Sequence, residues 1–230
     1  MKFLAGGLAG APSGSLGGLT ASHNRYGYYY RARVIPTKVV NENTLTARAR
    51  LVDASQHWGT LSAAEQMAWA TYAESAPITD RLGSKQVLTG HAAYVQLNAR
   101  ILVGGGTMID APPVSAAPPA LLTMVTTFDI GIGTSLITFT ACPLAANHCL
   151  YVQGAVLLNP GQAYFKNRLK LIYVSTAALA AAYDYEADMG ARFGPLAVGQ
   201  RVVLLASVLD NTTGLISPPY IDQGTIVSTA

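Results

Sequence analysis

The chain has 230 residues, of which 50% are hydrophobic and only 12% are charged, with 15 Lys and Arg against 12 Asp and Glu. This composition excludes a disordered polar tail, because such segments are poor in apolar residues. The charged fraction is about half of the roughly 25% found in a typical soluble domain. We therefore expect neighbouring subunits to cover much of the surface.

Signals for membranes, secretion and cross-linking are nearly absent from the sequence. The strongest apolar stretch, residues 202–209, is far shorter than the roughly 20 residues of a membrane-spanning helix, so we expect no membrane span. Residues 1–11 carry one positive charge and are interrupted by glycine, which predicts no signal peptide. Cys142 and Cys149 are interpreted as buried free thiols, with a disulfide across a short loop as the alternative.

Residues 1–43 are predicted to form an extended, glycine-rich, basic arm. Six glycines fall between positions 6 and 18, a density that excludes a helix. Residues 25–36 alternate aromatic, basic and β-branched side chains, which favours an extended strand. Over residues 1–60, seven bases and two acids give a net charge of +5, so the positive charge of the chain lies at this end.

Residues 44–110 are predicted to form a small helical region. The first helix ends near Trp58 and carries on one face Leu45, Arg48, Ala49, Val52 and Gln56. The second opens at a capping box of Ser62 and Glu65 and ends before Pro77. The third runs from about Gly90 to Val103. Three short helices bury little core of their own, so we expect this region to dock onto another surface.

Residues 111–119 contain four prolines and are interpreted as a semi-rigid linker and the clearest domain boundary. Residues 120–230 predict an all-β domain, because seven short runs separated by turn residues fit a two-sheet sandwich. The expected strands are 123–129, 134–141, 149–156, 167–174, 181–187, 200–209 and 219–228. Residues 177–182 favour a turn of helix between strands.

Two resemblances add to this interpretation. Residues 201–210, the turn at Gly214 and Ser217-Pro218-Pro219 resemble a fibronectin type III or immunoglobulin-like module, which implies an immunoglobulin-like β-sandwich over residues 120–230. That half departs from the pattern because it lacks Trp, and its strand at 200–209 lacks Tyr. The front half is similar to uncharacterised phage-like structural proteins in Ser13-Gly14-x-x-Gly17, Arg25-Tyr26-Gly27, Trp58 and Trp69. The expected fold class is α+β, with an extended arm and a small helical region before the sandwich.

No motif predicts catalysis. The glycine-rich start lacks the Gly-Lys-Ser/Thr ending of a phosphate loop, and no nucleophile elbow or paired-cysteine zinc motif occurs. The four histidines are scattered, which predicts no metal site. Asp184, Glu186 and Asp188 alternate along an expected strand, and we favour a solvated face over a calcium site. We expect no enzyme, no cofactor and no metal.

The arm carries the candidate contact residues, which are Arg25, Tyr26, Tyr28, Tyr29, Tyr30, Arg31 and Arg33. Tyr and Arg are enriched in interface hot spots, and an arm can add a strand to a neighbour's sheet. The same residues could contact single-stranded nucleic acid, since Arg neutralises phosphate and Tyr stacks on bases. We favour a neighbouring subunit, because a charge of +5 is modest and no long basic run occurs.

These features predict a non-enzymatic structural subunit of a homo-oligomeric assembly, such as a virion or phage-like particle, tube or filament. Its partners would be copies of itself and other virion proteins, within a virion or an extracellular assembly. Two alternatives stay open at this point. One is a nucleic-acid-binding protein that uses the arm, and the other is a secreted adhesin or carbohydrate-binding module that uses the sandwich.

Overall fold

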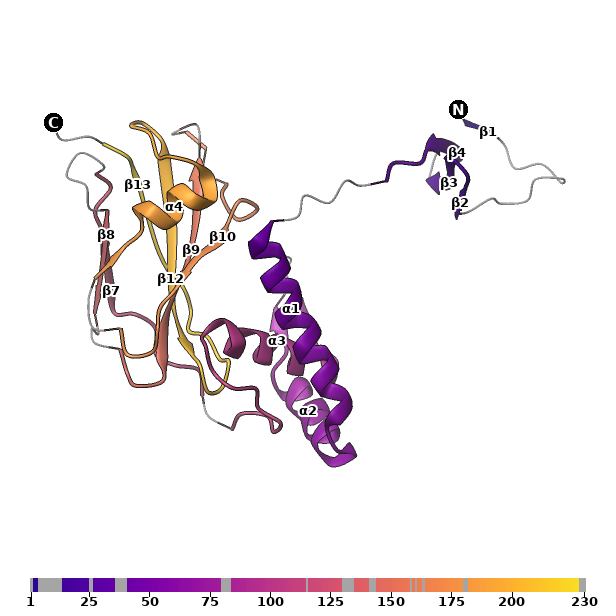
Figure 1. Cartoon of the computed structure of the whole chain (residues 1–230), viewed down its shortest axis with the longest axis horizontal. Helices are drawn as coiled ribbons and strands as arrows, with labels where there is room; N and C mark the ends of the chain where they lie inside the picture. The colour runs from indigo at the N-terminus through magenta and orange to yellow at the C-terminus, as the bar shows by residue number, and fades with distance from the viewer. Residues whose placement is uncertain are drawn as a thin grey trace. The chain divides into compact units, whose positions relative to one another are not determined.

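The chain has a mixed α+β fold in a computed structural model (Figure 1). It divides into two compact units, residues 1–45 and residues 46–230, which are described separately below. The structure describes residues 2–3, 14–24, 27–35, 41–79, 84–114, 116–129, 135–140, 144–157, 159, 161–162, 164–179 and 182–227.

The N-terminal unit contains a four-stranded antiparallel sheet. Its strands, in the spatial order β1-β4-β3-β2, are β1 (Lys2–Phe3), β4 (Gly27–Ala32), β3 (Leu19–Asn24) and β2 (Gly14–Leu16). A two-residue turn, Gly17–Gly18, joins β2 to β3, and Gly17 has a φ of 55°, the positive value that a type II′ turn needs at its first position. The strand predicted within residues 25–36 is confirmed as β4. The described segments fold back as hairpins, however, instead of running as one extended arm.

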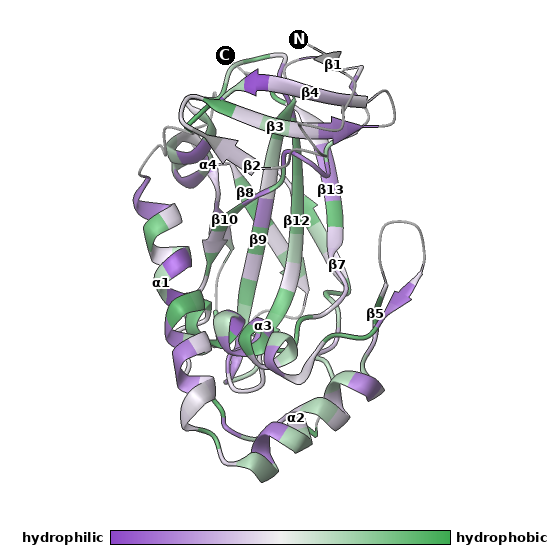
Figure 2. Cartoon of the chain, turned by 90° about the vertical axis from the view of Figure 1, so that its right-hand side faces the viewer, coloured by the Kyte–Doolittle hydropathy of each residue, from purple (hydrophilic) through white to green (hydrophobic). Residues whose placement is uncertain are grey.

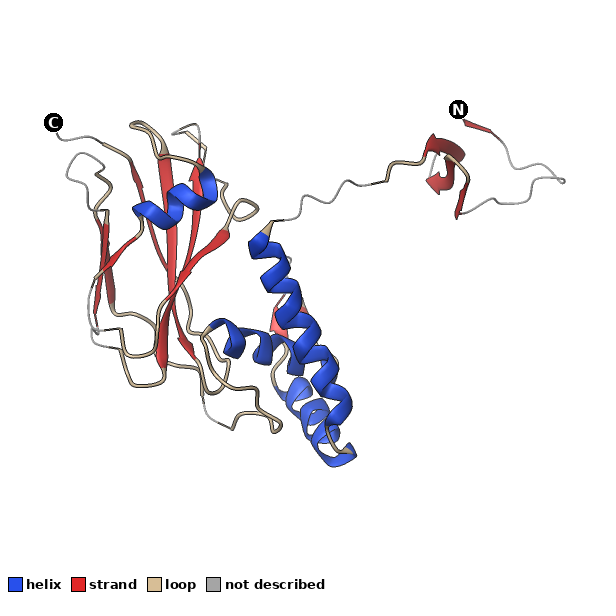
Figure 3. Cartoon of the chain, in the orientation of Figure 1, coloured by secondary structure: helices blue, strands red, loops and turns tan. Residues whose placement is uncertain are grey.

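The three predicted helices are confirmed as α1 (Glu42–His57), α2 (Ala63–Ser75) and α3 (Gly90–Val103) (Figure 3). A short 3₁₀ turn, η1 (Trp58–Thr60), follows α1, and a two-stranded ribbon of β5 (Ile78–Thr79) and β6 (Lys85–Gln86) separates α2 from α3 in sequence. The capping box of α2 is also confirmed. The Glu65 backbone N–H donates to Ser62 Oγ, and the Ser62 backbone N–H donates to the Glu65 carboxylate.

The face predicted for α1 is exposed and not packed. All five of its residues are exposed, namely Leu45, Arg48, Ala49, Val52 and Gln56. Within α1 only Ala54 is buried. On that side of the helix, Ser55 Oγ lies 3.2 Å from His91 Nε2 of α3. The apolar spacing therefore marks a stripe that the described residues do not cover.

Two antiparallel sheets follow. One has the order β10 (Lys170–Val174), β9 (His148–Leu157), β12 (Arg201–Asp210), β13 (Tyr220–Thr225), and the other β11 (Tyr183–Asp184), β8 (Leu136–Thr140), β7 (Thr123–Thr126). Each element overlaps one of the seven predicted strands. One buried cluster combines Met124 and Phe139 of the smaller sheet with Val202 and Leu204 of β12, so the sheets share a core. Apolar residues are concentrated along β12 (Figure 2).

The strand predicted at 181–187 is wrong beyond Asp184, because a helix, α4 (Glu186–Phe193), begins there. Glu186 and Asp188 occupy the first helical turn, where the helix dipole favours negative charge. They therefore do not share a strand face with Asp184, as the alternation had suggested. A turn of helix is predicted for residues 177–182, but the described residues of this range, 177–179 and 182, are not helical, and 177–178 form a turn. Residues 180–181 lie outside the described residues.

The proline-rich stretch 111–119 lies inside one compact unit, since residues 46–230 are not divided. The helical region docks on the sheets of its own chain. Leu215, just beyond β12, packs against the buried cluster that contains Trp69 and Tyr94. The Cys149 thiol of β9 donates to the Gly104 carbonyl at the end of α3, with a sulfur–oxygen distance of 3.7 Å.

This docking makes Gly214 a sensitive position. A Cβ there would lie 2.4 Å from the Leu97 carbonyl oxygen of α3, and the residue has a φ of 70°. We expect Gly214→Ala to lower the free energy of unfolding by about 2–4 kcal/mol, because it combines backbone strain with overpacking. Gly199→Ala is the matched control, because Gly199 has a φ of 86° and open space around it. Backbone strain alone should lower the free energy of unfolding by about 1 kcal/mol there. Urea unfolding measures both, and equal losses would contradict close packing at Gly214.

Candidate inter-subunit surface

The candidate contact residues lie on the hairpin of β3 and β4. Residues 28–31, three tyrosines and Arg31, belong to β4, and Arg33 follows the strand. The Arg33 backbone N–H donates to the Gly18 carbonyl at 2.8 Å, which extends the pairing past the end of β4. Arg25 and Tyr26 lie outside the described residues. The structure thus gathers five of the seven predicted residues on one strand and its exit.

The pleat of β4 divides these residues between two faces. Because alternate strand residues point to opposite sides, Tyr28 and Tyr30 share one face, whereas Tyr29 and Arg31 share the other. His23 of β3 pairs with Tyr28, and their ring centroids are 5.7 Å apart. The hairpin therefore has an aromatic face and a second face that combines a tyrosine with an arginine.

This sheet has no core of its own among the residues that the structure describes. Every residue of 14–24 and 27–35 whose burial is defined is exposed or half-buried. Tyr30 is 38% exposed, Leu19 53% and Val34 81%. A small sheet needs a hydrophobic face packed on other elements to be stable. The aromatic face of the hairpin is therefore a candidate contact surface.

Helix α1 presents a second apolar surface. Leu45 and Val52 lie on one side of the helix, two turns apart, and each is 50% exposed. Leu51, at 49%, extends the surface. An uncovered apolar helix face is typical of a helix that docks into a groove.

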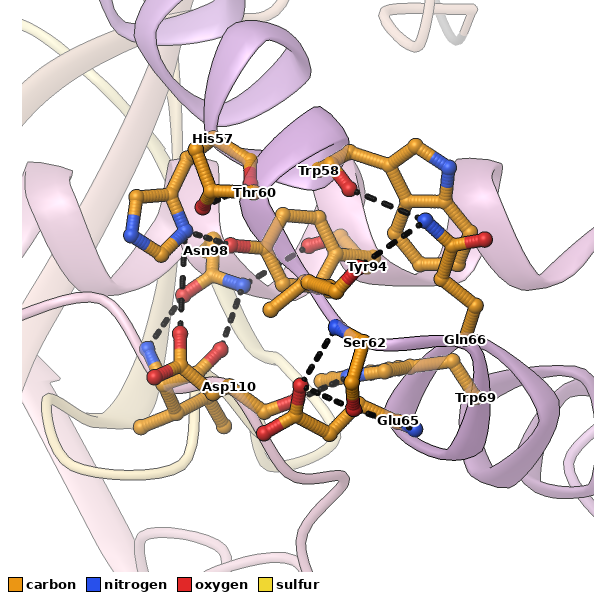
Figure 4. A network of polar contacts seen from close by, with 12 residues as sticks. His57, Trp58, Thr60, Ser62, Glu65, Gln66, Trp69, Tyr94, Asn98 and Asp110 are labelled. Carbon is orange, nitrogen blue, oxygen red and sulfur yellow. Dashed lines mark hydrogen bonds and ion pairs between the residues drawn. The ribbon is translucent and has the colours of Figure 1, made fainter.

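A polar network ties α1, α2 and α3 together (Figure 4). His57 Nδ1 lies 2.6 Å from the Tyr94 hydroxyl oxygen and 3.6 Å from the Asp110 carboxylate. The Trp69 indole N–H donates to the Asp110 backbone carbonyl at 2.7 Å. Burial and the charge of Asp110 raise the pKa of Tyr94 to about 12, so the hydroxyl stays neutral at physiological pH.

Asn98 completes the network from the buried side of α3. Its amide donates to the Ile109 carbonyl at 3.2 Å and accepts from the Ile109 backbone N–H at 2.8 Å. The side chain thus holds the segment before Asp110 against the helix. Because the buried polar groups satisfy one another, we interpret the network as a structural clamp.

The described residues contain no group of three His, Cys, Asp or Glu that could hold a metal ion. Cys149 is a buried thiol, and its pKa is raised by burial and by the charge of Asp210. Cys142 lies outside the described residues, so the pairing of the two cysteines stays a prediction. No helix in the described ranges has the length and apolarity to cross a bilayer.

One basic cluster was missed by the sequence reasoning. Lys166 and Arg168 are exposed on a turn, and Lys170 opens β10. The signal is present in the sequence as a base at every second position, 166, 168 and 170.

No family model and no curated protein sequence matches the chain. The resemblances stated above therefore rest on the motifs that suggested them.

Proposed function

We propose that the chain is a non-enzymatic structural subunit of a homo-oligomeric assembly, a component of a virion or phage-like particle, tube or filament. The observation that carries this proposal is the four-stranded N-terminal sheet, which lacks a buried side chain in its described part. Ordering a backbone costs on the order of 1 kcal/mol per residue. The described residues of this sheet bury no side chain that could offset that cost, and we infer that a second copy of the chain supplies the missing contacts.

The chemistry of the exposed residues supports a protein partner. Tyr28, Tyr30 and Arg31 are of the types that dominate interface hot spots, because they bury large areas and still make hydrogen bonds. The stripe of Leu45 and Val52 on α1 adds apolar area that water does not favour. A homo-oligomer that buries both surfaces accounts for a chain with so few charges.

The strand order supports an immunoglobulin-like module within this subunit. In constant-type immunoglobulin domains, strands A, B, E and D form one sheet and C, F and G the other. We letter the strands β7 to β13 as A to G in chain order. Strands A, B and E are then β7, β8 and β11, which form one sheet. Strands C, F and G are β9, β12 and β13, which form the other sheet together with strand D, β10. The fourth strand, β10, has changed sheets, and β9 lacks the Trp typical of strand C.

Sedimentation velocity of the purified full chain tests the proposal. We expect species much heavier than the 24.1 kDa monomer, growing with protein concentration and persisting in high salt, because apolar contacts are not screened. A single monomer at high micromolar concentration would contradict the proposal. Assembly only in the presence of nucleic acid, lost steeply with salt, would instead support a nucleic-acid-binding protein.

A further inference from the structure

The basic cluster lies on a turn folded over the outer face of the larger sheet. Phe165 and Leu169 pack against a small buried cluster that includes Val203 and Leu205 of β12. These β12 residues alternate with those that face the shared core. The Arg168 backbone N–H donates to the Phe165 carbonyl at 2.8 Å and closes the turn. The apolar residues therefore fix the turn, and its polar residues between them face solvent.

A cavity of about 360 Å³ adjoins this turn. It is lined by Val156, Asn167, Arg168, Leu169, Lys170 and Phe193. The volume is at the lower end of the range for small-molecule sites, which is roughly 300–1,000 Å³. The lining thus combines three apolar side chains with two cationic side chains and an amide.

Lys170 joins the cavity to the end of α4. Its ammonium lies 4.6 Å from the centroid of the Phe193 ring and donates to the Arg192 carbonyl at 3.3 Å. Cations are favoured at helix C-termini, so this contact holds α4 against β10. An ammonium has three donors, and the Arg192 carbonyl takes one of them.

Four basic side chains gather around this cavity. Residues 120–230 contain five bases, and four of them belong to the turn, β10 or the last turn of α4: Lys166, Arg168, Lys170 and Arg192. Within the described ranges, none of these four forms an ion pair. A hollow lined by charge of one sign concentrates ions of the opposite sign.

We propose that this cavity binds a phosphate group, carried by a free nucleotide or by a nucleic-acid backbone. Arg168 can hold phosphate through two parallel hydrogen bonds, Lys170 adds a point charge, and Asn167 adds an amide donor. Several bases around one hollow match the multiple charge of phosphate better than the single charge of a carboxylate. Tyr164, 53% exposed two residues before Lys166, is an available stacking surface for a base.

Fluorescence anisotropy of the full chain with a labelled single-stranded oligothymidylate tests this site. We expect Arg168→Gln combined with Lys170→Gln to weaken binding about tenfold and to lower the salt slope by about 1.4, since each single-strand phosphate contact contributes about 0.7. Both side chains are exposed, and an unchanged melting curve confirms the fold. Arg50→Gln combined with Lys85→Gln removes the same charge elsewhere and should change binding less than about twofold.

Competition identifies the source of the phosphate. Displacement by thymidine monophosphate or inorganic phosphate supports a free-nucleotide ligand, whereas resistance to both, with tight oligonucleotide binding, supports a backbone ligand. Equal displacement by oligoglutamate of matched charge would overturn the proposal in favour of an acidic protein segment. Unchanged binding by the Arg168 and Lys170 variant, or an equal loss in the Arg50 and Lys85 control, would overturn it as well.

Discussion

Removal of residues 2–35 is expected to leave the remaining chain folded and monomeric, while the full chain assembles. Residues 46–230 form a compact unit with their own core, so the melting curve of the truncated protein should keep its cooperative transition. The removed segment carries the N-terminal sheet, whose described residues bury no side chain, so its stability depends on contacts beyond itself. Sedimentation velocity should show the loss of heavy species at every concentration tested.

A double substitution distinguishes the contribution of the hairpin backbone to assembly from that of its charged side chains. Arg31→Ala combined with Arg33→Ala should weaken assembly less than the truncation, because strand pairing and the Tyr28 and Tyr30 face survive. Assembly of the truncated chain at the level of the full chain would contradict a role for the hairpin between subunits. The α1 stripe would then be the remaining candidate surface.

Trp69→Ala is expected to be among the most destabilising substitutions, at about 3–5 kcal/mol. Trp69 is fully buried, and its ring centroid lies 5.2 Å from that of Tyr94 in an edge-to-face contact. Alanine would leave a cavity between α2 and α3 and remove the hydrogen bond to the Asp110 carbonyl. Urea unfolding should show a lower midpoint with an unchanged slope.

Two controls in the same helix sharpen this test. Trp69→Phe keeps an aromatic ring but loses the indole donor, so we expect a smaller loss of about 1–2 kcal/mol. Met67→Ala changes a side chain that is 73% exposed and should stay within about 0.5 kcal/mol of the parent. Similar losses for Trp69→Ala and Met67→Ala would show that the aromatic cluster does not carry the stability of the helical region.

The assembly and stability experiments test other parts of the chain than the phosphate-binding experiment, because the hairpin, the Trp69 cluster and the basic turn occupy different segments. Loss of assembly with intact oligonucleotide binding, or the reverse, would separate the two proposals. The chain would then be a subunit with a binding function, or a binding protein that does not assemble.

The sequence by itself determined the elements that depend on near neighbours. The Ser62–Glu65 capping box set the start of α2, Gly104 followed the end of α3, and the seven β runs were placed by their turn residues. Each of these signals acts over a few residues, through hydrogen bonds or backbone dihedral angles that the local sequence controls. The mixed α+β class followed from them.

Only the tertiary structure decided which surfaces meet. Apolar spacing located the stripe of Leu45 and Val52 on α1, but the buried residue of this helix is Ala54. The side of a helix that is covered depends on its packing partners and not on periodicity alone. His57, Tyr94 and Asp110 form one network although they are far apart in the chain. Lys170 likewise reaches the end of α4 only because β10 lies beside that helix. Such contacts depend on how distant segments pack, which no local pattern records.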